Sequence, residues 1–373
     1  MVTGGGKTFF ALQCFRALRE NFADLRLVVV VPTIALLDQW CVAAQLDLGL
    51  VEGDVAAYSG EGQAQRPGIA NIFVVNTARS ELSSVVSSGR WMLVVDECHR
   101  VGSRENARAL DGTYFAALGV SATPERQFDD GFNLYIKPRL GRVIYEYDYS
   151  AAKRDGVIAP FEVHNIRFAL TTEEKKKYDT LSARIAKHIR SHESRGEEVR
   201  TSPLLQALLR YRARVSLSAR WRIPTALAAL RSRKGKAIVF HERIEAAEEI
   251  AAILDKGDRR VTTYHSKIYG PSRRERLRLF RLGVFDTLVT CRSLDEGLNV
   301  PDASLAVIVA STRSRRQRIQ RLGRVLRVTD EHKRAVVVTL YATPPEERQL
   351  QLEEEQLTDV ADVRWYNAKA IGG

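Results

Sequence analysis

The sequence of 373 residues is poor in the residues that build metal centres and disulfide frameworks. Its four cysteines, Cys14, Cys41, Cys98 and Cys291, lie far apart and form no C-x-x-C pair, so neither a zinc site nor a set of disulfides is indicated. The hydrophobic runs are too short to span a membrane, and the first residues lack the basic-then-apolar plan of a signal peptide. We therefore expect a cytoplasmic protein with no membrane partner.

Positive charge is concentrated in the middle of the chain. Lys plus Arg outnumber Asp plus Glu by 19 to 8 in residues 151–235, against 14 to 17 before that segment and 24 to 20 after it. Most of the net charge of +12 therefore belongs to one segment, which favours a surface that binds a polyanion. A solvated helical face is the alternative.

A glycine-rich segment close to the start of the chain matches the second half of a phosphate-binding loop, G-x-x-x-x-G-K-[ST]. Gly4, Gly5 and Gly6 precede Lys7 and Thr8. In such a loop backbone amides approach phosphate, the lysine reaches the β- and γ-phosphates, and the hydroxyl binds Mg²⁺. Met1 stands where the first glycine of the pattern belongs, and no strand precedes the loop. We expect a chain that is truncated within this loop; a flexible terminus is the alternative.

Short apolar runs separated by helical periodicity predict a parallel sheet with both faces covered. The runs are Leu25–Val31, Ile72–Val75, Met92–Val95 and Leu118–Val120. Ligands of such sheets bind at the carboxyl ends of the strands. Asp96 and Glu97 directly follow the third run. We predict that Asp96 holds Mg²⁺ and that Glu97 orients or deprotonates the attacking water. For the tetrapeptide D-E-C-H at 96–99 taken alone, the alternative is the polar start of a loop.

Two hydroxyl residues follow the next apolar run, about 25 residues later. Ser121 and Thr123 could hydrogen-bond the loop that carries His99, and these residues are candidate couplers of nucleotide state to the nucleic-acid surface. The alternative is a turn that ends the strand before Pro124.

The central segment predicts two helices. A capping box, T-x-x-E, begins the first at Thr171, and a second stretch from about Leu204 to Trp221 carries Arg210, Arg212 and Arg214. Arginines there would bind phosphate without reading sequence. The alternative is a solvated connector.

A second set of short apolar runs predicts another sheet beyond about Pro224. These runs are Ala237–Phe240, Val261–Tyr264, Thr287–Thr290, Leu305–Val309 and Ala335–Leu340. Arg324 and Arg327 lie three residues apart and would share a helix face. Two guanidiniums presented together can stabilise a transferring phosphoryl group, which is the arginine-finger role, although a nucleic-acid-binding or solvated face is the alternative.

Four motifs in the first half carry a family resemblance. G-G-G-K-T at 4–8, P-T-I-A-L-L-D-Q-W at 32–40, D-E-C-H at 96–99 and S-A-T at 121–123 resemble motifs I, Ia, II and III of superfamily 2 DExH-type helicases and translocases. The D-E-x-H form and the S-A-T-P-E-R stretch are similar to the XPB-like group, and restriction-enzyme translocase subunits are close cousins. XPB-like proteins carry Arg-Glu-Asp just after S-A-T, whereas Gln127, Phe128 and Asp129 follow Arg126 here, so the strand-separating role of that triplet is not carried over.

The resemblance implies an α/β protein with two RecA-like parallel-sheet domains and a basic helical insert between them. ATP and Mg²⁺ would bind between the domains, and nucleic acid would lie across them. By motif, Pro32, Thr33 and Gln39 would contact nucleic acid. Asp295 to Gly297 resembles motif V, which places Gly297 at the nucleotide, and the stretch from Gln320 resembles motif VI, which gives Gln320 a catalytic role.

These features predict four regions and one main function. The regions are a first domain at 1–150, a connector and insert at 151–222, a second domain at 223–345, and an acidic helix and tail at 346–373. We predict an ATP-dependent DNA helicase or double-strand DNA translocase, with RNA as the alternative ligand. The rival is a nucleic-acid clamp whose shortened loop no longer turns over ATP; an ATPase that acts on protein is a weaker third. The sequence identifies no nuclease, repair or defence partner.

Overall fold

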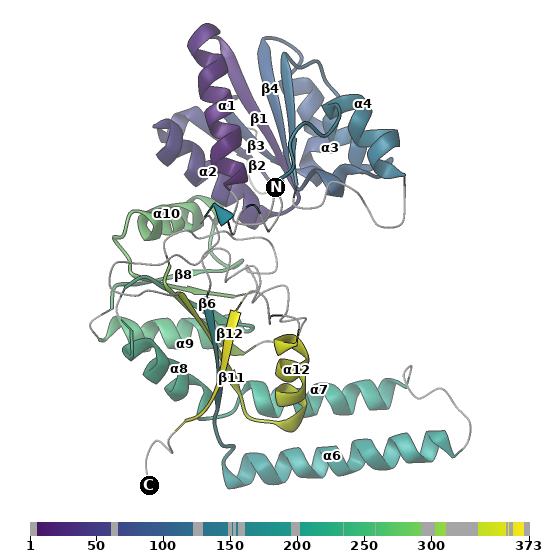
Figure 1. Cartoon of the computed structure of the whole chain (residues 1–373), viewed down its shortest axis with the longest axis vertical. Helices are drawn as coiled ribbons and strands as arrows, with labels where there is room; N and C mark the ends of the chain where they lie inside the picture. The colour runs from purple at the N-terminus through teal and green to yellow at the C-terminus, as the bar shows by residue number, and fades with distance from the viewer. Residues whose placement is uncertain are drawn as a thin grey trace. The chain divides into compact units, whose positions relative to one another are not determined.

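The chain folds into two compact units, each built on a parallel β-sheet (Figure 1). The computed structural model describes residues 6–60, 66–121, 130–147, 151, 154–155, 161–194, 202–233, 235–257, 259–291, 303–310, 335–355, 357 and 361–368. The first unit contains the described residues up to 155 together with 264–284, and the second contains the others. Two parallel-sheet α/β units are what the sequence predicts.

The first sheet has five parallel strands in the order β2-β3-β1-β4-β5. Its elements in chain order are α1 (Lys7–Asn21), β1 (Leu25–Val31), α2 (Ile34–Leu48), β2 (Val55–Tyr58), β3 (Ala70–Val74), α3 (Val75–Val85), β4 (Arg90–Asp96), β5 (Ala116–Val120) and α4 (Lys137–Leu140), with short 3₁₀ or π turns η1 (Glu52–Asp54), η2 (Cys98–Val101), η3 (Asn106–Leu110) and η4 (Phe132–Ile136). The predicted strands are present, and β2 is an additional edge strand.

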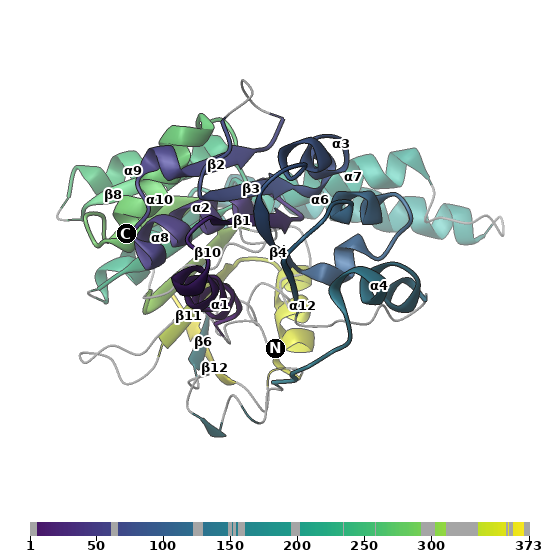
Figure 2. The ribbon, with the colours of Figure 1, turned by 90° about the horizontal axis from the view of Figure 1, so that it is seen from above.

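Both faces of the first sheet are buried because successive side chains of each strand point to opposite faces. Leu27 and Val29 share a core cluster with α1 and α2, whereas Val28 and Val30 share another with α3 and the turns around η3. Figure 2 shows α1 and α3 on opposite sides of the strands. This two-sided burial explains why the strands are continuous apolar runs.

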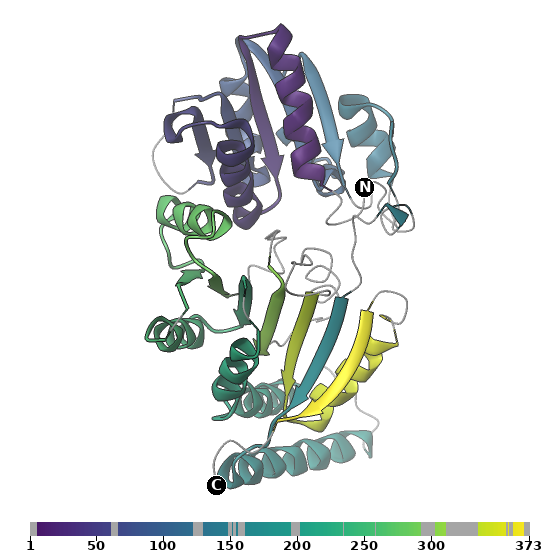
Figure 3. The ribbon, with the colours of Figure 1, turned by 60° about the vertical axis from the view of Figure 1, so that its left-hand side comes forward.

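The second sheet has seven strands in the order β12-β6-β11-β10-β7-β9-β8. The strands are β6 (Phe161–Arg167), β7 (Ala237–His241), β8 (Val261–Tyr264), β9 (Thr287–Thr290), β10 (Leu305–Ala310), β11 (Ala335–Tyr341) and β12 (Ala361–Asn367). The helices of this part of the chain are α6 (Thr172–Glu193), α7 (Pro203–Leu217), α8 (Arg222–Arg231), α9 (Ile244–Asp255), α10 (Gly270–Arg281) and α12 (Pro344–Glu354). Of these helices, α10 belongs to the first unit. Figure 3 shows β12 beside β6 at the edge of this sheet. The sequence did not predict β12 or its pairing with β6. The domain limits at 222 and 345 stay predictions.

A helical hairpin of α6 and α7 leads from β6 to α8 (Figure 1). The capping box predicted at its start is present: Thr171 Oγ1 accepts a hydrogen bond from the Glu174 amide at 3.2 Å, and Glu174 Oε2 accepts one from the Thr171 amide at 2.9 Å. Ile185, Leu205 and Leu208 form the buried core of the hairpin. Its second helix ends at Leu217, short of the Trp221 expected from the sequence.

One buried arginine connects the end of this hairpin to the second sheet. Arg222, only 1% exposed, begins α8 and donates hydrogen bonds with its whole guanidinium. The acceptors are the Ser216 carbonyl at 2.9 Å, the Ser216 hydroxyl at 2.9 Å, the carbonyls of Val309 and Leu340 at 2.7 and 3.1 Å, and the Glu346 carboxylate at 2.7 Å. These bonds join α7, β10, β11 and α12. Within the described residues no helix combines the length and apolar character needed to cross a membrane.

Candidate functional site

The candidate site lies where β4 ends and α1 begins, within the first unit. Strand β4 delivers Asp96 at its last position, where the side chain is buried to 6% exposure. Its two carboxylate oxygens accept from different donors: Oδ2 from the Trp40 indole Nε1 at 2.8 Å, and Oδ1 from the Glu97 amide at 2.9 Å. A carboxylate held on both oxygens has a fixed orientation.

Lys7 and Asp96, predicted to serve one nucleotide, interact electrostatically in the folded unit. Burial raises the pKa of Asp96, while the hydrogen bond from Trp40, the positive charge of Lys7 and the Glu97 amide oppose that rise. Lys7 is the first residue of α1, and Gly6 before it has φ of +78°, a conformation that glycine adopts without strain. Thr8 follows in the first helical turn and is half-buried. The helix start thus places Lys7 close enough to Asp96 for their charges to interact.

Glu97 has an unusual backbone conformation. Its φ and ψ are both 49°, and it is the one non-glycine residue with positive φ among those the structure describes. A non-glycine residue in this region is strained, and such strain concentrates at functional sites. The left-handed turn ends β4 and starts η2. Consequently the carboxylate of Glu97 stays about a quarter exposed while that of Asp96 is buried.

His99 connects this loop to the end of the neighbouring strand. Its Nδ1 lies 2.9 Å from Ser121 Oγ and 3.4 Å from Glu97 Oε2. The hydrogen bond between Ser121 and the D-E-C-H loop, expected from the sequence, is therefore present. The coupling role assigned to His99 and Ser121 stays a prediction.

The side chain of Cys98 turns into the core between these polar residues. It is 5% exposed, and burial, followed by the charges of Glu97 and Asp96, raises the pKa of its thiol to about 12. A thiol of that pKa is not a nucleophile at neutral pH.

The oxygen atoms of Asp96 and Thr8 suit a hard cation that keeps most of its water ligands. Each oxygen of Asp96 accepts one of the two hydrogen bonds described above and has a further lone pair, and Thr8 supplies a hydroxyl at the start of α1. In the described part of the chain no three His, Cys, Asp or Glu side chains gather closely enough to form a metal cage. Mg²⁺ bound through one carboxylate, a hydroxyl and substrate phosphates needs no such cage. The residues present therefore fit Mg²⁺.

The residues assigned to nucleic acid differ in exposure. Thr33 caps α2, with its Oγ1 accepting from the Leu36 amide at 3.3 Å, and Gln39 is buried. Arg210 and Arg214 are exposed on α7. The guanidinium of Arg212 instead lies 5.6 Å from the Tyr178 ring centroid, and one of its nitrogens lies 3.5 Å from the Ser182 hydroxyl.

The remaining predicted site residues are Pro32 and seven residues that the structure does not describe. Pro32, which follows β1, is half-buried. Gly4, Gly5, Thr123, Gly297, Gln320, Arg324 and Arg327 lie outside the described residues. Their assignments stay predictions.

Sequence reasoning did not single out Trp40. The P-T-I-A-L-L-D-Q-W motif contains it, but the resemblance suggested no role for this residue. A buried indole N–H needs an acceptor, which is the signal that could have prompted a search for one. The acceptor, Asp96, is 56 residues away in the sequence.

Two family models match the chain, one in each half. Residues 1–126 match the model described as "Type III restriction enzyme, res subunit", and residues 221–329 match "Helicase conserved C-terminal domain". The two matches include the candidate site and the stretch that contains Arg324 and Arg327, respectively.

Curated relatives match across most of the chain. The "DNA 3'-5' translocase XPB2" of Sulfurisphaera tokodaii is 28% identical over 88% of this chain and 74% of its own length. The "DNA 3'-5' helicase XPB" of Kineococcus radiotolerans is 26% identical over 88% of this chain and 54% of its own length. The chain thus spans between about half and three quarters of these two relatives.

A solved structure supports the fold. The Hef helicase domain of Pyrococcus furiosus matches with a TM-score of 0.53 and 18% identity, over 95% of this chain and 94% of that one. At this identity the match shows the fold alone, which is the two-domain RecA-like architecture predicted from the motifs.

Proposed function

The chain belongs to the superfamily 2 DExH-type helicases and is similar to their XPB-like group, and from that premise we propose that it is an ATP-dependent DNA helicase or double-strand DNA translocase. The family implies ATP and a divalent metal. Coupling of ATP hydrolysis to movement on DNA by this chain is the part that we propose.

The observation that carries the proposal is the pair of carboxylates at the end of β4, one of which interacts with Lys7. Asp96 is buried and fixed by two donors, whereas Glu97 is more exposed and strained. A buried carboxylate held by two donors suits a metal ion, and a more exposed one suits a water molecule. The two side chains thus suit two different roles.

In this mechanism the γ-phosphate is held by Lys7 and by the amides at the start of α1. Asp96 and Thr8 would hold Mg²⁺, which would supply positive charge to offset that of the phosphates. Glu97 accepts a proton from the attacking water or orients it, and its carboxylate is more exposed than that of Asp96. These side chains need to form no covalent bond with the substrate, because phosphoryl transfer depends chiefly on positioning and electrostatics.

His99 and Ser121 connect this chemistry to the neighbouring strand. A change at Glu97 alters the contacts of His99 Nδ1, which has both Glu97 and Ser121 within reach. Ser121 leads into the segment that contains Thr123. We expect this pair to report the state of the nucleotide to the DNA-binding surface.

Arg324 and Arg327 complete the proposed machinery from the second domain. They would stabilise charge on the γ-phosphate as arginine fingers, so hydrolysis would require domain closure. Nucleic acid that favours the closed state would then stimulate turnover. Exposed Arg210 and Arg214 on α7 would supply phosphate contacts.

DNA-stimulated ATPase activity of the wild-type chain and of Lys7→Ala, Glu97→Gln and Arg324→Ala tests the proposal. Each variant should lose at least about 100-fold in turnover, the scale on which single catalytic groups act. Glu20→Gln is the control because Glu20 is exposed near the opposite end of α1 from Lys7, and this variant should retain activity. Full activity in all three site variants would disprove the mechanism. DNA binding that is insensitive to ATP would instead favour a clamp.

A second experiment distinguishes helicase from translocase. Strand displacement from a forked duplex measures unwinding, and displacement of a triplex-forming strand from intact duplex measures translocation. Activity in the second assay alone identifies a translocase. Activity in neither, with ATPase intact, would overturn coupling to movement on DNA.

A further inference from the structure

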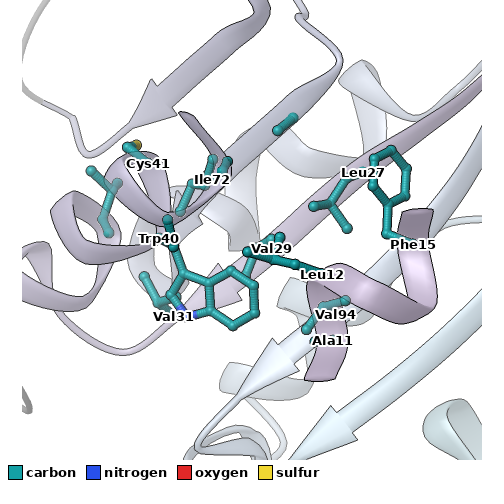
Figure 4. Packing of buried hydrophobic residues seen from close by; sticks show 14 of the residues in the cluster. Ala11, Leu12, Phe15, Leu27, Val29, Val31, Trp40, Cys41, Ile72 and Val94 are labelled. Atoms are coloured by element: carbon teal, nitrogen blue, oxygen red, sulfur yellow. The ribbon is translucent and has the colours of Figure 1, made fainter. Parts of the chain in front are cut away.

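The indole of Trp40 lies inside the core and yet reaches the candidate site. Trp40 is fully buried on α2 and belongs to the core cluster that joins α1, α2 and the first sheet. Figure 4 shows its ring among Leu12, Val29 and Val31. Its single polar atom, Nε1, donates to Asp96 Oδ2 at 2.8 Å. Apolar packing accounts for the ring, whereas the acceptor accounts for the orientation of the N–H.

The chemistry of this bond restricts what Trp40 can do. Indole N–H is a donor only and does not titrate, so it supplies a fixed donor that water cannot easily replace at full burial. A hydrogen bond to a carboxylate is stronger than one between neutral groups. With the Glu97 amide on the other oxygen, the two donors hold the plane of the Asp96 carboxylate.

Helix α2 connects this donor to the segment that we assign to nucleic acid. Thr33 caps the helix and Gln39 immediately precedes Trp40. The helix is buried without a break from Ala35 to Ala44. A displacement of α2 therefore moves the indole donor relative to β4, and the Asp96 carboxylate with it.

We propose that Trp40 is a positioning residue that fixes the Asp96 carboxylate for the metal–nucleotide complex and links it to α2. The proposal rests on the proposed function. Groups that orient a metal-binding carboxylate typically change metal affinity by 10- to 100-fold when they are removed. The indole N–H should therefore affect the metal dependence of nucleotide binding.

Trp40→Phe tests the proposal because it keeps an aromatic ring and removes the N–H. Trp91→Phe is the matched control: Trp91 is 1% exposed, lies at the other end of β4, and donates its Nε1 to the Ser88 carbonyl at 2.7 Å. Binding of a fluorescent non-hydrolysable ATP analogue is titrated with Mg²⁺ in the full chain. We expect the Mg²⁺ concentration at half-saturation to rise about tenfold in Trp40→Phe and to stay unchanged in Trp91→Phe.

A second measurement needs no destabilising substitution. In the ¹⁵N-labelled wild-type chain, addition of Mg²⁺ and the same analogue should shift the Trp40 indole N–H resonance and leave that of Trp91 in place. Equal Mg²⁺ dependence in the two variants, or an unshifted Trp40 resonance in a chain that binds the analogue, would overturn the role of Trp40 alone. Failure of the wild-type chain to bind the analogue at any Mg²⁺ concentration would overturn the proposed function as well.

Discussion

Replacing the buried Arg222 is expected to destabilise the second unit strongly. Its guanidinium is 1% exposed and donates to Ser216, Val309, Leu340 and Glu346, and it lies 4.9 Å from the Phe168 ring centroid. Arg222→Met keeps much of the volume but leaves the buried carbonyls and the carboxylate without this donor. Breaking a buried ion pair in this way costs about 3–5 kcal/mol.

The control is Arg220→Met, two residues earlier. Arg220 is exposed and lies 5.6 Å from the Trp221 ring centroid, so the same substitution there should change the free energy of unfolding by roughly 0.5 kcal/mol or less. Arg222→Lys should fall between the two, because lysine keeps the charge but has no planar fork of donors.

Urea unfolding followed by the fluorescence of Trp221 measures these differences, with Trp40, Trp91 and Trp365 replaced by Phe in every sample. The free energy of unfolding of Arg222→Met should fall by about 3–5 kcal/mol relative to that background. A loss within about 1 kcal/mol of that seen for Arg220→Met would refute the reasoning, because it would mean that the buried acceptors find other donors at little cost.

Three further predictions concern charge and reactivity. Arg210→Ala and Arg214→Ala should each lower the magnitude of the slope of log DNA affinity against log salt by about 0.9. Arg212 is half-buried, so Arg212→Ala should change the free energy of unfolding and leave this slope unchanged. Equal slopes for all three variants would contradict this. Burial, and then the charge of Arg222, lowers the pKa of His241 from 6.5 to about 4, so between these pH values the unfolded chain binds more protons than the folded chain. About 3 kcal/mol of stability should therefore be lost as pH falls from 6.5 to 4. Urea unfolding of His241→Gln should not show this loss. Burial raises the pKa of Cys98 to about 12, so iodoacetamide at pH 8 should label Cys98 only after unfolding, as mass spectrometry would show.

The strands buried on both faces were predictable because their sequences contain little else than apolar residues. Leu25–Val31 is bounded by Pro32 and matches β1 at both ends. Of the four edge strands, β5 and β8 were predicted, whereas β2 and β12 were missed. Val55–Tyr58 is short and rich in alanine, and Ala361–Asn367 alternates exposed charged residues with half-buried ones after an acidic helix. A run of four residues is too short to show a period, and the alternation in the second segment was overlooked because an acidic run precedes it.

The candidate site was predictable as far as strand ends could place it. The rule that parallel strands present ligands at their carboxyl ends correctly associates Asp96 with Ser121 and with the loop between them. The indole donor on α2 was not predictable, because most positions of that helix are apolar and its sequence does not show which side chain reaches β4. The role of Arg222 was hidden in the same way, since its acceptors lie up to 124 residues away.

The central claim is that Glu97 drives hydrolysis of a nucleotide held by Lys7 and Asp96. The most direct measurement is DNA-stimulated ATP hydrolysis by Glu97→Gln beside the wild-type chain, with binding of the non-hydrolysable analogue measured in both. Glu97→Gln should bind the analogue as tightly as wild type and hydrolyse ATP at least about 100-fold more slowly. Hydrolysis by Glu97→Gln at the wild-type rate would contradict it.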